Sequence, residues 1–120
     1  MDIIEKAAEA LKELSDEGVT VQQGWYDKNI HDLHITLWNL GEYEDAHSDD
    51  AAEIEVASIQ VNIWSDKDQI ALKKRVKKLM KKAGFYYTGS NDNLETDTKV
   101  FSSAMRFIAA EETGQGEENE

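Results

Sequence analysis

The three histidines are the first residues in this sequence whose type suggests chemistry, because neutral imidazole is the commonest metal ligand in proteins. His31 and His34 are three residues apart near the start of a predicted strand, so their side chains point to opposite faces. His47 lies in an acidic segment with aspartates on both sides. That segment could hold a divalent cation only weakly, because it lacks the ordered ligand spacing of an EF-hand loop. The sequence therefore predicts no metal site.

Motifs for nucleophilic or phosphate chemistry are missing from the sequence. The chain has no cysteine, and neither a G-x-S-x-G elbow nor an S-x-x-K motif occurs in it. The two glycine-rich phosphate-binding patterns, G-x-G-x-x-G and G-x-x-x-x-G-K-[ST], are absent as well. We therefore expect no catalytic residue, no cofactor and no enzymatic activity.

One strongly basic segment lies in an otherwise acidic chain. Residues 66–83 contain eight basic and two acidic residues, a net charge of +6, whereas the whole chain carries −12. The rest must therefore carry −18. Lysine-rich helix faces are often simply solvated, with their aliphatic stems covering apolar neighbours. The alternative is that this face meets a carboxylate-rich surface on another molecule. Binding to DNA competes with that reading, and the net charge disfavours it.

The elements that position these residues follow from periodicity. Residues 2–17 have apolar side chains at helical spacing, with Asp2 and Glu5 in capping-box relation and Gly18 as a stop. Residues 19–26 and 33–38 alternate and predict two strands paired as a hairpin. Residues 41–53 contain six carboxylates and no base, and predict a solvated extended loop or hairpin tip. Residues 54–64 predict a third strand whose change of phase suggests a β-bulge near positions 57–58.

The second half of the sequence predicts a helix followed by two strands. Ser65 is a candidate N-cap, a stripe of apolar residues runs from Leu72 to Ala83, and Gly84 ends the helix. Residues 85–88 and 98–109 predict strands on either side of a turn-rich segment. The order α-β-β-β-α-β-β favours an α+β fold, with an antiparallel or mixed sheet of about five strands and two helices packed on one face.

Length and composition indicate one domain. The chain has 120 residues, no proline, no cysteine and no apolar run long enough to span a membrane. The N-terminal segment lacks the layout of a signal peptide, so we expect synthesis in the cytoplasm and no membrane contact. We expect a single domain over residues 1–110. Residues 111–120 contain five acids and no apolar side chain, so we expect a disordered acidic tail there.

The arrangement resembles the tail terminator or tail-to-head joining proteins of long-tailed, siphovirus-type bacteriophages. Three features carry this resemblance: the element order, the strand that runs through Trp64-Ser65 into an amphipathic helix, and the closing hairpin with its run VFSSAMRFIA. It covers about residues 1–110. The family implies an α+β structural protein, in most members a hexameric ring, that ends the tail tube and joins the tail to the head.

The resemblance also implies partners and contact residues. The partners are other copies of the chain, the tail tube protein and a head-completion or connector protein, and DNA passes through the ring without specific binding. The location implied is the tail or neck of a virion assembled in a host cell. Candidate contacts are lysines of the basic helix and carboxylates of the acidic segment. They are Lys73, Lys77, Lys81, Glu42, Glu44, Asp45, Asp49 and Asp50.

Two other functions stay open. Another head–tail connector, neck or minor tail protein would share the size, charge and ring formation of a tail terminator. A monomeric acidic binding module, such as a DNA mimic, belongs to a different class. Such mimics lay carboxylates over most of their surface, and the +6 segment argues against that distribution.

Overall fold

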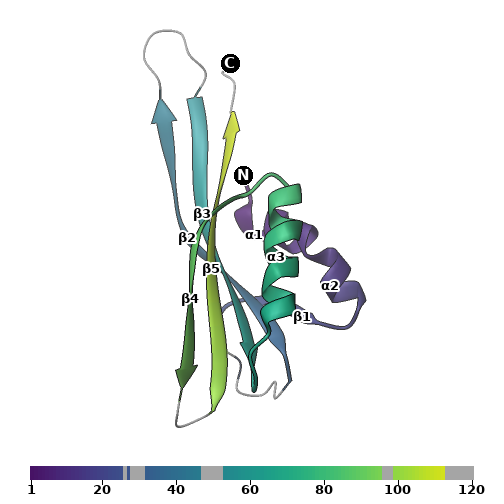
Figure 1. The fold of residues 1–120 in the computed structure, drawn as a ribbon. Coiled ribbons are helices and arrows are strands. Elements are labelled where there is room, and N and C mark those ends of the chain that lie inside the picture. Colours follow the sequence, from purple (N-terminus) through teal and green to yellow (C-terminus); the bar gives the residue numbers. More distant parts are fainter. Residues whose placement is uncertain (26, 28–31, 47–52, 96–98, 113–120) are drawn as a thin grey trace.

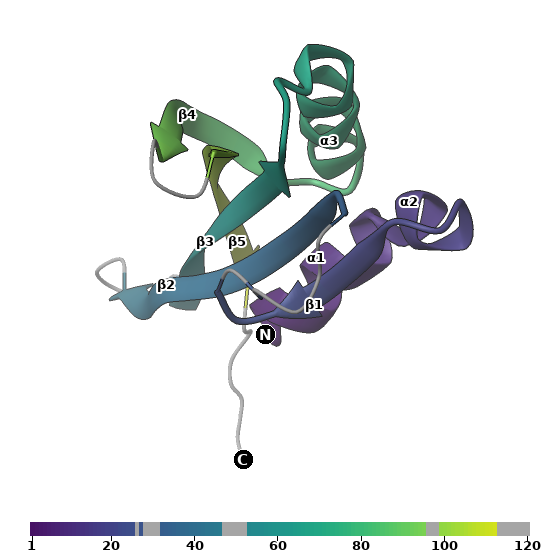
Figure 2. The same cartoon turned by 90° about the horizontal axis from the view of Figure 1, so that it is seen from below.

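The computed structural model describes residues 1–25, 27, 32–46, 53–95 and 99–112. Three helices lie on one face of a five-stranded mixed sheet, so the predicted α+β class is confirmed (Figures 1 and 2). The sheet order is β1-β2-β3-β5-β4. The elements are α1 (Ile3–Ala10), α2 (Lys12–Asp16), β1 (Thr20–Gln23), β2 (His34–Ala46), β3 (Glu53–Ser65), α3 (Ile70–Lys82), β4 (Tyr86–Glu95) and β5 (Val100–Glu112).

The first two strands are parallel, so the predicted hairpin between them is wrong. Thr20 pairs with His34 and Gln23 with Leu37, so β1 and β2 run in the same direction. Alternating hydrophobicity is identical for parallel and antiparallel neighbours, and it therefore could not reveal the direction. The other pairings, β2 with β3, β3 with β5 and β4 with β5, are antiparallel.

The hydrophobic core lies between the sheet and the helices. Odd-numbered positions of β3 face the helices, and Ala57, Ile59, Val61 and Ile63 are all buried there. The helices contribute further buried side chains to the same cluster, which are Ile3, Ala7, Leu11, Leu14, Val76 and Met80. One core therefore serves the whole chain that the structure describes.

The predicted N-terminal helix is divided in two. Leu11 leaves helical geometry (φ −99°, ψ 11°) and separates α1 from α2, while its side chain stays fully buried. Asp2 caps α1 as expected, because its carboxylate accepts a hydrogen bond from the Glu5 amide at 3.0 Å. The break lets the apolar residues before and after Leu11 both reach the core.

Both predicted glycine stops are confirmed. Gly84 follows α3 with φ +99°, the Phe85 amide donates to the Met80 carbonyl at 3.1 Å, and the Gly84 amide donates to the Lys81 carbonyl at 3.0 Å. This pair of bonds is the Schellman motif. Gly18 ends α2 in the same way, with φ +101°.

The start of α3 differs from the prediction. Ser65 ends β3 instead of capping the helix, and the N-cap is Gln69, which makes no side-chain capping bond. The Ser65 hydroxyl accepts hydrogen bonds from the Lys67 amide and from Gln69 Nε2, both at 3.2 Å. Ser65 therefore shapes the turn between β3 and α3.

The expected bulge lies in β2, opposite the predicted place in β3. Asn39 pairs with Ile59 and Gly41 with Ser58, so Leu40 is the extra residue. The register between β3 and β5 has no shift. Both faces of β3 carry apolar residues, and for that reason the apolar alternation in its sequence changes from even to odd positions. Ile54 and Val56 lie on the face away from the helices.

A three-stranded extension, here called the arm, continues past the helices (Figure 1). It consists of residues 41–46 of β2, 53–56 of β3 and 110–112 of β5. The molecule measures 53 × 27 × 24 Å, and its radius of gyration of 16.4 Å exceeds the roughly 14 Å expected for a compact chain of this length. Residues 41–46 and 53 of the acidic segment are paired strand residues, and residues 47–52, where a loop or hairpin tip was expected, lie outside the described part. Glu111 and Glu112, which were expected to belong to the acidic tail, are part of β5, and residues 113–120 lie outside the described part.

Candidate interaction surfaces

Helix α3 carries seven basic residues and no acidic one, and two of the seven are used inside the molecule. Lys73 is 20% exposed and its ammonium lies 2.7 Å from an Asp92 carboxylate oxygen on β4 and 3.7 Å from Asp68. The second Asp92 oxygen accepts a hydrogen bond from Ser103 at 2.9 Å. The Lys73 ammonium and the Ser103 hydroxyl hold the pKa of Asp92 below its ordinary value, and Asp92 raises the pKa of Lys73.

Arg75 is the second internal cation. Its guanidinium makes a bidentate pair with Glu17 and a further bond to Glu13 at 2.6 Å, which connects α3 to α2. The hydrogen bonds from Arg75 lower the pKa of Glu17. Lys73 and Arg75 therefore stabilise the position of α3 on the sheet and beside α2.

Four of the other five lysines of α3 form an outward surface, here called the lysine groove. Lys74, Lys77, Lys78 and Lys81 line a shallow depression of about 400 Å³. Their spacing of i, i+3, i+4 and i+7 places them on one helix face. Lys77 lies over the Tyr87 ring, 4.2 Å from its centroid, and is half-buried. The other three are exposed and form no ion pair with the residues that the structure describes.

The arm gathers carboxylates on the side of the sheet that carries the helices. The register places Glu55 of β3 opposite Glu111 of β5, and Glu42 of β2 lies on the same face. Glu42 is exposed and accepts a hydrogen bond from Asn39 Nδ2 at 3.0 Å. Glu55 accepts one from the Met1 ammonium at 2.6 Å. Like charges that are opposite each other in a sheet repel, so this row favours a cationic neighbour.

The helix-free face of the sheet carries an aromatic cluster. Trp25 packs edge-on against Trp38 and Trp64, with ring centroids 6.3 Å and 5.4 Å apart. Trp25 and Trp38 are 54% and 47% exposed, whereas Trp64 is buried and donates from Nε1 to Thr36 Oγ1 at 2.9 Å. An exposed aromatic pair on a sheet face is typical of interaction surfaces.

His34, one of the metal-ligand candidates, is a buried structural residue. Its ring stacks on Trp64, its Nε2 accepts a hydrogen bond from the Asp27 amide at 3.4 Å, and its Nδ1 lies 3.0 Å from the Asp32 carbonyl oxygen. These partners assign the ring proton to Nδ1. His31 and His47 lie outside the described residues. Across the part of the chain that is described, no group of three or more histidine and carboxylate residues could hold a metal ion.

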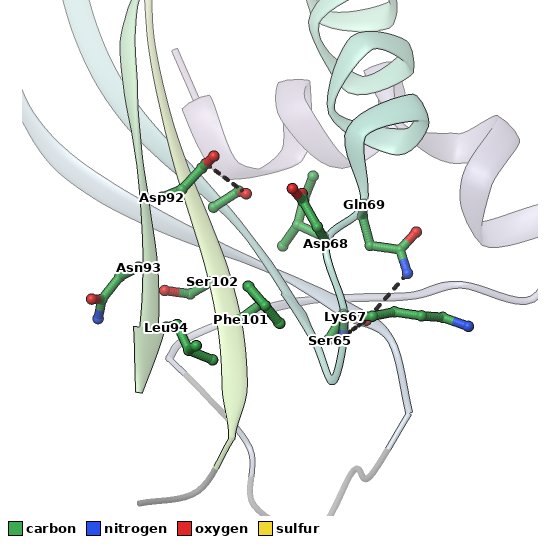
Figure 3. A pocket seen from close by; sticks show the side chains of 11 residues that line it. Ser65, Lys67, Asp68, Gln69, Asp92, Asn93, Leu94, Phe101 and Ser102 are labelled. Atoms are coloured by element: carbon green, nitrogen blue, oxygen red, sulfur yellow. Dashed lines mark hydrogen bonds between the residues drawn. The ribbon is translucent and has the colours of Figure 1, made fainter. Parts of the chain in front are cut away.

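A crevice that the sequence did not indicate lies where the β4–β5 hairpin meets the turn into α3 (Figure 3). Its volume is about 200 Å³, and Leu94, Phe101 and Ile63 form its apolar wall. The Asp92–Ser103 and Gln69–Ser65 hydrogen bonds lie at its border. Its residues come from β3, β4, β5 and the turn before α3, and no sequence pattern connects them.

The structure brings some of the predicted contact residues together and separates others. Lys77 and Lys81 lie in the lysine groove with Lys74 and Lys78, which sequence analysis had not singled out, whereas Lys73 is engaged with Asp92. Of the acidic candidates, Glu42 is exposed on the arm, and Glu44 and Asp45 are strand positions there. Asp49 and Asp50 lie outside the described residues.

Comparison with known proteins gives a match at the level of the fold. No protein-family model matches the sequence, and no curated protein matches it significantly. Among solved structures, a chain from the virion of a native gene transfer agent (GTA) particle matches with a TM-score of 0.62 and 12% sequence identity. The match covers 91% of this chain and 93% of the other.

The two chains share a fold. At 12% identity the likeness concerns architecture alone, and it extends over nearly the full length of both chains. None of the described helices is long and apolar enough to cross a membrane.

Proposed function

We propose that this protein is a structural component of a phage-like virion that forms a ring at the end of the tail tube and joins tail to head. The observation that carries the proposal is the near full-length fold match to a chain of a GTA virion. It agrees with the resemblance to tail terminator proteins seen in the element order and in the closing hairpin. The role is one of assembly and needs no catalytic residue.

Charge distribution supports a role in assembly. The lysine groove and the carboxylate row of the arm are separate surfaces of opposite sign on one chain. A contact between two different patches of the same protein produces a ring when its rotation closes. The DNA-mimic alternative is less well supported, because a mimic would not present four lysines on one helix face.

The arm and the aromatic cluster offer further contact areas. The arm projects from the body, as expected for a segment that reaches a neighbouring subunit or protein (Figure 1). Trp25 and Trp38 expose about half of their surface on the helix-free face. In the proposed role these surfaces meet other copies, the tail tube protein or the head connector.

Deletion of the gene in the cell that produces the particles tests this function. We expect filled heads and separate tails of irregular length, because the protein that ends the tube and joins it to the head is then missing. Complete particles should be restored when the gene is supplied in trans. Electron microscopy and mass spectrometry of purified particles provide the measurement. Complete, DNA-delivering particles formed without the protein would refute the proposal. Another connector or neck role would instead give tails of normal length that lack only the head attachment.

A further inference from the structure

The lysine groove and the acidic arm both carry charge that is not balanced within the chain, and the two surplus charges have opposite signs. Two of the basic residues of α3, Lys73 and Arg75, have carboxylate partners at 2.6–2.7 Å in the same molecule. Lys74, Lys78 and Lys81 have none among the described residues and are exposed around the groove. The surplus positive charge of the helix is therefore concentrated on one outward surface.

The arm has the complementary surplus. On the helix side of its strands the register aligns Glu55 with Glu111, and Glu42 adds a third described glutamate on the same face. The described parts of the arm contain no lysine or arginine. Among the described residues, the Met1 ammonium donates a hydrogen bond only to Glu55. Its pKa is raised by that hydrogen bond first and also by the charges of Glu55, Glu111 and Glu42. Glu42 and Glu111 keep exposed carboxylates.

From this complementarity we infer that the acidic arm of one copy docks into the lysine groove of the next, as a head-to-tail contact. The inference rests on the proposed function, and it specifies which surfaces join the subunits of the ring. The occupant of the groove is a second copy of this chain, since the chain itself presents a carboxylate row beyond its helix layer. Four lysines against a row of glutamates would also orient the encounter electrostatically.

Charge reversal on each side provides the test. The groove variant Lys74→Glu/Lys78→Glu/Lys81→Glu spares Lys77, which packs on Tyr87, and the internal cations Lys73 and Arg75. The arm variant Glu42→Lys/Glu111→Lys leaves Glu55 and its bond to Met1 in place. The matched control Lys12→Glu/Lys67→Glu/Lys99→Glu changes the net charge as much as the groove variant does, on exposed residues away from the groove.

Native mass spectrometry and light scattering at low salt measure the result. We expect the wild type and the control to form a closed oligomer, and each of the two reversed variants to assemble at least about tenfold more weakly. An equimolar mixture of the groove and arm variants should assemble again, with the two chains alternating. In that mixture the reversed arm fits the reversed groove, and the two unaltered surfaces fit each other. Circular dichroism of each variant verifies folding.

Three outcomes would overturn the contact. They are a wild-type oligomer that survives both sets of reversals, a wild type that stays monomeric at millimolar concentration in low salt, and duplex-DNA binding that the groove variant abolishes. The last would make nucleic acid the occupant of the groove. None of these outcomes changes the result of the gene deletion, so failure of the contact and failure of the proposed function can be told apart.

Discussion

At the scale of single residues, a few polar side chains determine how the elements fit together. Asp92 accepts from Lys73 and Ser103 and so joins β4 to α3 and β5, and Thr36 accepts from buried Trp64 on the helix-free face. Both arrangements connect positions that are far apart in the sequence. Removing either of them should lower the free energy of unfolding.

Asp92→Asn should destabilise the protein at neutral pH by roughly 0.5–1 kcal/mol, since the Asp92 side chain is 53% exposed and solvent screens its ion pair. The folded-state pKa of Asp92 lies below its unfolded value of about 3.9. Its contribution is therefore present above that pH and is lost as the pH falls through the lower folded value. Urea unfolding between pH 2 and 7 should show a weaker acid dependence in this variant. Asp66→Asn, on an exposed residue outside the network, should leave the curve unchanged.

Trp64→Phe should lower the free energy of unfolding by about 1–3 kcal/mol, because it removes a buried hydrogen bond and part of a packed ring. Thr36→Val removes the acceptor instead. In a double-mutant cycle the two changes should couple by about 1 kcal/mol. Additive effects would show that the Trp64–Thr36 bond contributes no stability.

At the scale of elements, the chain relies on helix ends whose geometry only particular residues tolerate. Gly84 ends α3 in the left-handed region and directs the chain into β4, and a Cβ built there meets no atom within 4 Å. Substitution therefore affects backbone conformation alone. A substitution at Gly84 therefore measures the energetic cost of a positive φ without a contribution from steric clashes.

Gly84→Ala should reduce the free energy of unfolding by about 1–2 kcal/mol, the cost of a left-handed conformation for a residue with a Cβ. Gly84→Asn is the matched control, because asparagine tolerates this region better and should retain more of the stability. Thermal or chemical unfolding provides the measurement. An alanine variant as stable as the wild type would mean that α3 can end in another way.

At the scale of the whole molecule, one compact core supports an arm that extends beyond it. Ala109 is buried in the core at the base of the arm, whereas the residues of β5 after it pair only along the arm. The limit of the stable unit therefore lies near the end of β5. It lies beyond the boundary that composition alone suggested, because strand pairing includes Glu111 and Glu112.

Deletion of residues 113–120 should change the free energy of unfolding by less than about 0.5 kcal/mol, because this segment contains no apolar side chain. Deletion of residues 109–120 should cost about 1–3 kcal/mol, since it removes Ala109 and the partners of residues 54–57 in β3. Differential scanning calorimetry of the two truncated chains distinguishes them. Equal melting temperatures would contradict the placement of β5.

The sequence by itself determined the α+β class, the existence of most strands, the two glycine stops and the charge segregation. These features depend on local periodicity, turn chemistry and composition, which can be read within a short window. The divided N-terminal helix at Leu11 was missed because the apolar spacing on both sides fits one helix, and only packing against the sheet requires the break.

Only the tertiary structure decided the direction of β1, the strand that bulges and the use of each lysine. Parallel and antiparallel neighbours share the same alternation. The phase change in β3 comes from apolar residues on both of its faces, whereas the extra residue lies in β2. Lys73 and Lys77 have the same charge and lie on the same helix. Lys73 binds Asp92, which is 19 residues further along the chain, whereas Lys77 lies over the ring of Tyr87. Partners of this kind come from the pairing of strands, which brings together residues that no local pattern connects.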